Sequence, residues 1–225
     1  MKTGKEDTPI ARIFRNRREA GAELAGKLMK YAGRKDVIVI ALPRGGVETG
    51  VEIAERLNCP LDVIIVRKIG YPGQPELAIG AVAETGAVVL NEEIIAMGGV
   101  SKDYIDQESE EKKKEIQRRK ELYRGGADMP DMKGKTVIVV DDGVATGATM
   151  KSAISAVKKE RPEKVVVALP VASVEAKESI GAMVDEMLCL QAPPDFMAVG
   201  GYYEDFRQVT DEEVVEMLGR SRHAE

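Results

Sequence analysis

The fold of this chain is decided by one stretch, Val137-Ile138-Val139-Val140-Asp141-Asp142-Gly143-Val144-Ala145-Thr146-Gly147-Ala148-Thr149. Its first four residues are β-branched and apolar, which is typical of a strand buried on both faces in a parallel sheet. Two carboxylates follow the strand, then a loop of small residues, and then a helix-compatible run over 150–160. In open α/β sheets, ligands bind outside the carboxyl ends of the strands. The stretch therefore predicts an α/β fold with a ligand loop at this strand end.

The loop has the composition of a phosphate site. Gly143 and Gly147 allow tight backbone turns and a close approach to a ligand. Amide groups at the start of the following helix favour an anion, and the hydroxyls of Thr146 and Thr149 can add hydrogen bonds. The spacing excludes a Walker A loop, because no Gly-Lys-Ser/Thr follows, and the dinucleotide fingerprint G-x-G-x-x-G is also absent.

Asp141 and Asp142 indicate what else the ligand carries. Two carboxylates beside a lone phosphate would repel it, whereas they are suited to sugar hydroxyls or to a hydrated Mg²⁺. A sugar phosphate therefore fits this strand end better than a bare nucleoside triphosphate. The alternative is structural: an acidic pair that caps a helix after a core strand.

The whole stretch resembles the 5-phosphoribosyl-1-pyrophosphate (PRPP) binding motif of type I phosphoribosyltransferases. The resemblance implies that Asp141 and Asp142 hold the ribose 2′ and 3′ hydroxyls, with Mg²⁺ bound directly or through water. It also implies that the 5′-phosphate is wrapped by the residues of the loop, namely Gly143, Val144, Ala145, Thr146, Gly147, Ala148 and Thr149.

A second glycine turn follows another buried strand. The apolar run 37–42 predicts that strand, and Pro43-Arg44-Gly45-Gly46-Val47 leads from it into a predicted helix over 48–57. Alone, this turn is weak evidence for a site. Type I phosphoribosyltransferases have a Lys/Arg-Gly-Gly loop that contacts pyrophosphate, and Arg44, Gly45 and Gly46 match it. A guanidinium suits the bidentate phosphate contact.

The run 61–66 predicts the next strand, which ends in Arg67 and Lys68. Two adjacent cations at a strand end would face the ligand edge, or they would merely mark where the chain leaves the sheet. The segment 69–76 is rich in Pro and Gly and predicts a long loop, which is a candidate lid. Two apolar runs after it, 78–83 and 87–90, predict a β-hairpin.

The rest of the chain alternates between helix and strand. We expect a helix over 17–31, a strand over 164–171, a helix over 172–181 and a strand over 186–190. This order is typical of a mostly parallel twisted sheet with helices on both faces, which is also the sheet of type I phosphoribosyltransferases. The basic cluster Arg12, Arg15, Arg17 and Arg18 ahead of the first helix is typical of a solvated face.

A long charged helix is predicted over 101–124, inside an insertion of about 101–125. Ser101 is a suitable N-cap, and the apolar positions are sparse. The helix therefore buries only a thin stripe, as a solvated arm or as a contact in a homodimer. Nothing in it indicates catalysis.

The length, net charge and residue composition of the chain exclude several classes of protein. The chain has 225 residues, enough for one domain over 1–225 with a core of about 17–190, and its net charge of −5 gives no support to a nucleic-acid-binding surface. Cys59 and Cys189 are too few for a disulfide framework or a zinc site, and the single histidine, His223, lies in a polar tail. There is no apolar run of membrane-spanning length and no signal-peptide core. We expect a cytoplasmic protein.

The segment of about 191–210 predicts a small C-terminal hood. It holds Phe196, Tyr202, Tyr203 and, downstream, Asp205. Aromatic faces beside a sugar-phosphate site could stack a flat base, or they could close the open end of the core. The segment resembles the hood of 6-oxopurine phosphoribosyltransferases, which implies that these four residues bind the base.

The resemblance implies Mg²⁺-dependent transfer of 5-phosphoribosyl from PRPP to a nitrogenous base, with release of pyrophosphate. The residues it makes catalytic are Arg44, Arg67, Lys68, Asp141 and Asp142. Relatives that use 6-oxopurines carry an acid where this chain has Ala145. Either another group accepts the proton, with Glu76, Glu204 and Asp205 as the candidates, or the substrate base needs no proton acceptor at this position. Two other functions stay open: a regulatory protein that binds PRPP or a nucleotide without turnover, and an enzyme acting on another phosphosugar.

Overall fold

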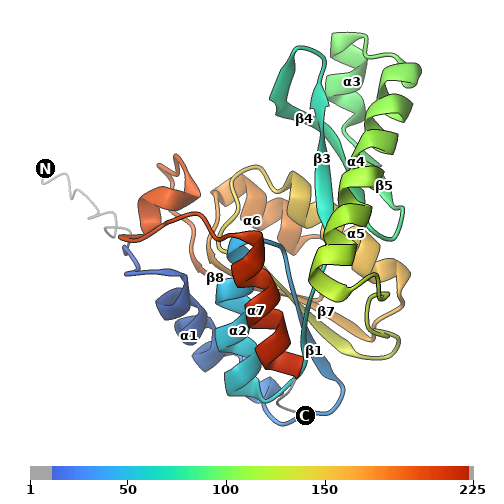
Figure 1. Ribbon diagram of the computed structural model, residues 1–225. Helices are drawn as coiled ribbons and strands as arrows, with labels where there is room; N and C mark the ends of the chain where they lie inside the picture. Colours follow the sequence, from blue (N-terminus) through green and yellow to red (C-terminus); the bar gives the residue numbers. More distant parts are fainter. Residues whose placement is uncertain (1–11, 223–225) are drawn as a thin grey trace, which may run out of the picture.

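The computed structural model describes residues 12–222, and it contains two separate sheets (Figure 1). The larger sheet has five strands in the order β2-β1-β6-β7-β8, and all of its pairings are parallel. Its strands are β1 (Val37–Ala41), β2 (Leu61–Val63), β6 (Thr136–Val140), β7 (Lys164–Val171) and β8 (Glu186–Gln191). The predicted mostly parallel α/β fold is confirmed.

Helices cover both faces of the large sheet, because alternate residues of each buried strand point to opposite sides. Odd-numbered residues of β1 pack in one apolar cluster with the first group of helices, which are α1 (Arg17–Lys27), α2 (Gly45–Leu57) and α7 (Asp211–Arg222). Ile38 and Ile40 pack in a second cluster on the other face, with α5 (Ala148–Lys159) and α6 (Val174–Gly181). The core therefore lies on both sides of the sheet.

The smaller sheet belongs to a lobe inserted between β2 and β6, which stands away from the core in Figure 1. It is antiparallel, in the order β3-β4-β5. The lobe consists of β3 (Val66–Tyr71), β4 (Gln74–Ala83), β5 (Val88–Leu90), α3 (Glu92–Gly98) and α4 (Lys102–Arg124). The predicted hairpin of residues 78–83 and 87–90 is confirmed as the pairing of β4 with β5.

Two predictions about this region were wrong. The run 61–66 is not one strand, because β2 ends at Val63 and β3 begins at Val66. Arg67 and Lys68 therefore lie inside β3, paired with β4, rather than at the end of a strand. The segment 69–76 is not a long loop but the tight end of the β3–β4 hairpin. Gly73 supplies the positive φ of 76° at its turn, and the pairing register shifts around Gly70. An irregular register of this kind accommodates proline in a strand, so the Pro and Gly residues mark the end of a hairpin.

The charged helix α4 has the predicted thin buried stripe. Ser101 caps it by accepting a hydrogen bond from the Tyr104 amide, and Gly125 ends it in the left-handed conformation. Its buried apolar side chains include Ile105, Ile116 and Tyr123. The helix packs on β3, β4 and α7 of its own chain, so it is not a free arm.

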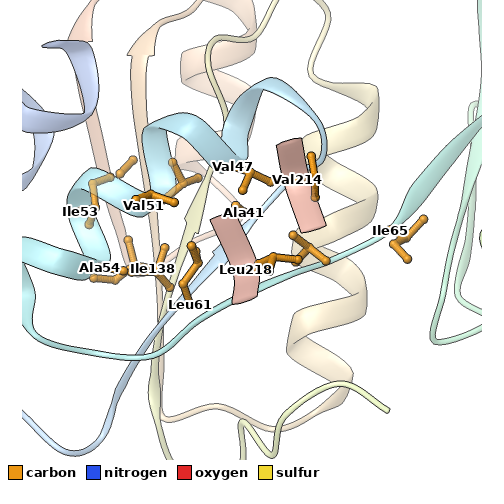
Figure 2. Close-up of a cluster of buried hydrophobic side chains, with 14 of the residues drawn as sticks. Ala41, Val47, Val51, Ile53, Ala54, Leu61, Ile65, Ile138, Val214 and Leu218 are labelled. Atoms are coloured by element: carbon orange, nitrogen blue, oxygen red, sulfur yellow. The ribbon is translucent and has the colours of Figure 1, made fainter. Parts of the chain in front are cut away.

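Helices α3 and α7 are elements that we did not predict. A capping signal precedes α7: the Thr210 hydroxyl accepts from the Glu213 amide, and the Glu213 carboxylate accepts from the Thr210 amide. The buried Val214, Met217 and Leu218 follow at helical spacing. Figure 2 shows Val214 and Leu218 directed into the core cluster.

Several boundaries also differ from the predictions. The helix predicted over 17–31 ends as α1 at Lys27 and is followed by a short 3-10 turn, Met29–Tyr31. Helix α2 begins three residues earlier than predicted, at Gly45, and α5 begins at Ala148. No helix in residues 12–222 is both long and apolar enough to cross a membrane.

Leu218→Ala is expected to lower the free energy of unfolding by about 2–5 kcal/mol, because the removed side chain is fully buried and leaves a cavity. Urea denaturation of both proteins measures the difference. Val215→Ala on the same helix is the control, since Val215 is 38% exposed. Equal losses for the two variants would show that α7 does not contribute to the core as described.

Candidate active site at the carboxyl edge of the sheet

A cavity of about 540 Å³ lies at the carboxyl ends of β1 and β6, beside the first residues of β3. It is lined by Leu42, Pro43, Arg44, Gly45, Val66, Arg67, Lys68, Lys112, Glu115, Asp141, Asp142 and Thr149. A neighbouring cavity of about 240 Å³ is lined by Lys68, Asp141, residues 143–150 and Val199. The structure thus brings the glycine turn, the Arg-Lys pair and the acidic motif together. All five predicted catalytic residues line the larger cavity.

The loop after β6 has the geometry of an anion site. Gly147, at a φ of 82°, is the N-cap of α5 and offers no side chain to the first amides of that helix. The first residues of α5 line the smaller cavity, where a phosphate would satisfy those amides. The loop is fixed from behind, because the Val144 amide donates to the Val171 carbonyl and the Ser173 hydroxyl donates to the Ala145 carbonyl.

The glycine turn after β1 is pressed against the acidic motif. A Cβ at Gly45 would overlap the Asp142 carboxylate, and a Cβ at Gly46 would lie 2.9 Å from Asp141 Cα. Only glycine can occupy these two positions without displacing the aspartates. The turn leads directly into α2, which explains why this helix begins at Gly45 rather than at residue 48.

Arg17 is a site residue that the sequence analysis misplaced. Its Nε lies 2.7 Å from Asp142 Oδ2, its NH1 donates to the Arg207 carbonyl, and Glu48 is 3.6 Å away. The residue is only 5% exposed. The expectation of a solvated basic cluster is therefore wrong for Arg17, although Arg12, Arg15 and Arg18 are exposed. No local pattern signals this pair, because the two residues are 125 positions apart.

The two aspartates are buried carboxyls held in different ways. Burial and the neighbouring charge of Asp142 raise the pKa of Asp141 well above its ordinary value. Burial also raises the pKa of Asp142, but the guanidinium of Arg17 opposes that shift. The Asp142 amide donates to Asp141 Oδ1 over 2.9 Å. Both carboxyls are therefore costly to ionise and would be stabilised as anions by a cation or by hydroxyl donors.

The donor set suits Mg²⁺ only in part. Two adjacent carboxylates supply the hard oxygen ligands that this ion prefers. Among residues 12–222, however, no group of three or more His, Cys, Asp or Glu side chains could hold a metal ion. A magnesium ion at Asp141 and Asp142 would therefore take the rest of its coordination from water and from a phosphate ligand, as Mg²⁺ commonly does.

Two arginines of the larger cavity, Arg44 and Arg67, each form an ion pair with a carboxylate from a helix that is distant in the sequence. Arg67 Nε lies 2.7 Å from Glu115 Oε1 on α4, and Arg44 NH1 lies 4.0 Å from Asp211 Oδ1 on α7. Burial lowers the pKa of the Arg67 guanidinium, and Glu115 opposes the shift. We expected nothing at a ligand site from the charged helix, yet α4 contributes both Lys112 and Glu115.

The four predicted base-binding residues lie outside the lining of both cavities. Phe196 and Tyr202 stack on each other with ring centroids 5.4 Å apart, and Tyr203 stacks on Phe206 at 5.1 Å. Tyr203 is buried, and its hydroxyl donates to the Asp142 carbonyl. Asp205 is exposed and accepts from the Arg207 amide. In this arrangement the aromatics close the end of the core.

Val199 is the hood residue that reaches the smaller cavity. It belongs to the short 3-10 segment Val199–Tyr202, and a Cβ at Gly143 would lie 2.5 Å from its Cγ1. Of the three candidate proton acceptors, Glu204 and Asp205 are exposed and line neither cavity. Glu76 lies in β4, and its side chain is outside the part of the chain that the structure describes.

Asp141→Asn is expected to raise the thermal midpoint of the ligand-free protein near neutral pH. The pKa of Asp141 is raised in the folded state, so ionisation costs stability as the pH rises above the ordinary value of 3.8. Asparagine keeps the acceptor oxygen for the Asp142 amide without the charge. The gain should therefore shrink as the pH falls toward that value, in melting curves recorded across pH without Mg²⁺.

Asp131→Asn is the control for this measurement, because Asp131 is exposed. It should leave the midpoint nearly unchanged at every pH. An Asp141→Asn variant that is no more stable than wild type at neutral pH would contradict the electrostatic description of the acidic pair.

We compared the chain with protein-family models, with curated proteins and with solved structures. A family model described as "Phosphoribosyl transferase domain" matches residues 11–207. Two relatives, from the Mycobacterium tuberculosis strains CDC 1551 / Oshkosh and ATCC 25618 / H37Rv, are each named "Putative phosphoribosyl transferase". Each is 42% identical over 212 residues, which are 93% of this chain and 47% of the relative. The chain thus spans about half the length of these two proteins.

Among solved structures, the crystal structure of TT1426 from Thermus thermophilus is similar over nearly the whole length. The two chains are 46% identical, with a TM-score of 0.78, and the match covers 92% of this chain and 97% of the other. The parallel sheet with its strand-end loops, the family match over residues 11–207 and these relatives agree. The chain belongs to the phosphoribosyl transferase domain family.

Proposed function

We propose that this protein is a Mg²⁺-dependent phosphoribosyltransferase that transfers 5-phosphoribosyl from PRPP to a nitrogenous base. The observation that carries the proposal is the close approach of Gly45 to Asp142 and of Gly46 to Asp141, beside the loop that leads into α5. Three features then lie side by side: the turn that carries Arg44, the proposed sugar-binding carboxylates of Asp141 and Asp142, and the proposed phosphate loop of residues 143–149. PRPP carries its pyrophosphate, ribose hydroxyls and 5′-phosphate in the same order.

Each part of PRPP has a proposed partner. The amides and hydroxyls of residues 143–149 bind the 5′-phosphate, in the smaller cavity. Asp141 and Asp142 accept hydrogen bonds from the ribose 2′ and 3′ hydroxyls. Arg44, together with the turn that it shares with Gly45 and Gly46, faces the pyrophosphate from the larger cavity. Mg²⁺ held at the acidic pair would supply positive charge to the pyrophosphate oxygens.

The proposed reaction is a displacement at C1 of the ribose. The bond from C1 to the pyrophosphate oxygen breaks, and the leaving group keeps its electron pair. The lone pair of the base nitrogen forms the new bond to C1, and the proton of that nitrogen passes to solvent. Positive charge develops on the ribose while negative charge gathers on the pyrophosphate, where Arg44, Arg67 and Lys68 are placed to stabilise it.

A regulatory protein that binds PRPP without turnover is the alternative. The Arg-Gly-Gly turn and the Arg67–Lys68 pair favour an enzyme, because a sensor needs no machinery for a leaving group. The relatives named as phosphoribosyl transferases favour the same choice. The absence of an acid at Ala145 makes a 6-oxopurine a poor choice of base, so the acceptor belongs to another class of nitrogen nucleophile.

Calorimetric titration of PRPP is expected to show binding that depends on Mg²⁺ and is lost in Asp141→Asn/Asp142→Asn. Each lost charge-assisted hydrogen bond should weaken binding roughly ten- to a hundredfold. Asp128→Asn/Asp131→Asn removes the same charge from exposed positions and should bind like wild type. Wild-type protein that binds no PRPP would refute both the transferase and the regulatory alternative.

A screen of nitrogenous bases then separates the enzyme from the regulatory protein. With PRPP and Mg²⁺, the enzyme should release pyrophosphate only when its base is present, because the base must displace it at C1. Arg44→Met should lower that rate on the order of a hundredfold, since it removes a preorganised group facing the leaving pyrophosphate.

PRPP binding without turnover on any base would favour the regulatory protein. Release of pyrophosphate without a base would indicate a hydrolase. Arg56→Met is the matched control, because Arg56 is an exposed α2 arginine away from both cavities that donates to the Ala22 carbonyl. This variant should keep the wild-type rate.

A further inference from the structure

The inserted helix α4 forms one wall of the larger cavity. Figure 1 shows this helix running from the outer lobe alongside β3 toward α7. Lys112 and Glu115 are three residues apart, so they lie on the same face of the helix. Both line the cavity together with Arg44, Arg67 and the acidic pair. A helix that comes from an insertion thus supplies charge to the proposed pyrophosphate site.

Ion pairs fix this face of α4 over the cavity. Glu115 Oε1 lies 2.7 Å from Arg67 Nε and 3.6 Å from Arg119 Nε. Arg119 NH1 lies 3.6 Å from Asp211 Oδ1 on α7, which is also the carboxylate behind Arg44. The side chains of Arg119 and Asp211 are 14% and 19% exposed, so water screens their attraction only partly. A series of ion pairs therefore connects the two arginines that line the cavity. It runs from Arg67 through Glu115, Arg119 and Asp211 to Arg44.

The charges of the cavity leave Lys112 available to an anion. Glu115 is engaged by Arg67 and Arg119, and Asp142 is engaged by Arg17. The ion pair of Lys112 is with Glu108, one turn back on the same helix, at the longer distance of 3.6 Å. Its side chain is 28% exposed. A partly buried ammonium favours a negatively charged ligand at a cavity in which two of the three lining carboxylates, Glu115 and Asp142, already have cationic partners.

We propose that Lys112 is a further pyrophosphate-binding residue, held over the cavity by the Glu115 and Arg119 ion pairs. The proposal rests on the proposed function, because it assigns the residue to the leaving group of PRPP. Pyrophosphate carries several negative charges and gains more as the C1 bond breaks, so another cation at its far side stabilises both the bound substrate and the transition state. Lysine acts there as a point charge with three donors.

The test is calorimetric titration of two separate ligands, inorganic pyrophosphate with Mg²⁺ and ribose 5-phosphate. Lys112→Met should weaken pyrophosphate binding roughly ten- to a hundredfold, because a charge-assisted contact is lost. It should leave ribose 5-phosphate binding unchanged, since that ligand lies against the phosphate loop and the acidic pair. Lys112→Arg should restore most of the pyrophosphate affinity, because it returns the cation.

Lys113→Met is the matched control. Lys113 is the next residue on α4, is 46% exposed, and pairs with Glu110 at 2.6 Å outside both cavities. This variant removes the same charge from the same helix and should bind both ligands like wild type. Melting curves of all variants establish that each is folded at the temperature of the titrations.

The outcomes separate this proposal from the function on which it rests. If wild type binds PRPP and pyrophosphate but Lys112→Met binds pyrophosphate equally well, the assignment of Lys112 is wrong and the proposed function stands. Equal weakening for both ligands, or the same loss in Lys113→Met, would overturn the assignment too, because the effect would then be general. Wild type that binds neither PRPP nor pyrophosphate would overturn the proposed function and this proposal together.

Discussion

The ion pair between Arg17 and Asp142 is the contact on which the ligand edge depends. Asp141 and Asp142 are adjacent, buried and mutually repulsive, and the protein would favour their protonated forms without a cation. Arg17 supplies that cation from α1, with its side chain 6% exposed. A buried charge that loses its partner is costly, so α1 is fixed to the end of β6. Gly45 then completes the arrangement, because the absence of a side chain lets the turn after β1 touch the same carboxylate.

The cations and carboxylates of the site are therefore paired with each other, and the partners come from segments that are distant in the sequence. Arg67 and Arg44 face the cavity, and each has a carboxylate behind it, from α4 and α7 respectively. Such backing holds a long, flexible cation in one place and reduces the entropy lost when a phosphate binds. The inserted lobe, which stands away from the core in Figure 1, thereby lines the cavity at the edge of the parallel sheet, and the C-terminal helix supplies the carboxylate behind Arg44.

The hood closes the core and reaches the site through one apolar residue. Tyr203 is buried against Phe14 and supports the Asp142 carbonyl through its hydroxyl, so its contribution is to hold the acidic motif. Val199 lies over Gly143 at the smaller cavity. The loop after β6 is thus polar and held by hydrogen bonds, whereas the hood contributes an apolar contact.

The sequence alone determined the parallel sheet, the loop after β6 and the glycine turn, because each depends on local periodicity or on residues that are adjacent in the chain. The division of the β1 and β6 side chains between two core clusters follows from the same local pattern. Only the tertiary structure decided that Arg17 meets Asp142, that Lys112 and Glu115 face the cavity, and that residues 69–76 form a hairpin end. The physical reason is that ion pairs between distant helices depend on how those helices pack, and packing is not encoded in the spacing of residues along one element.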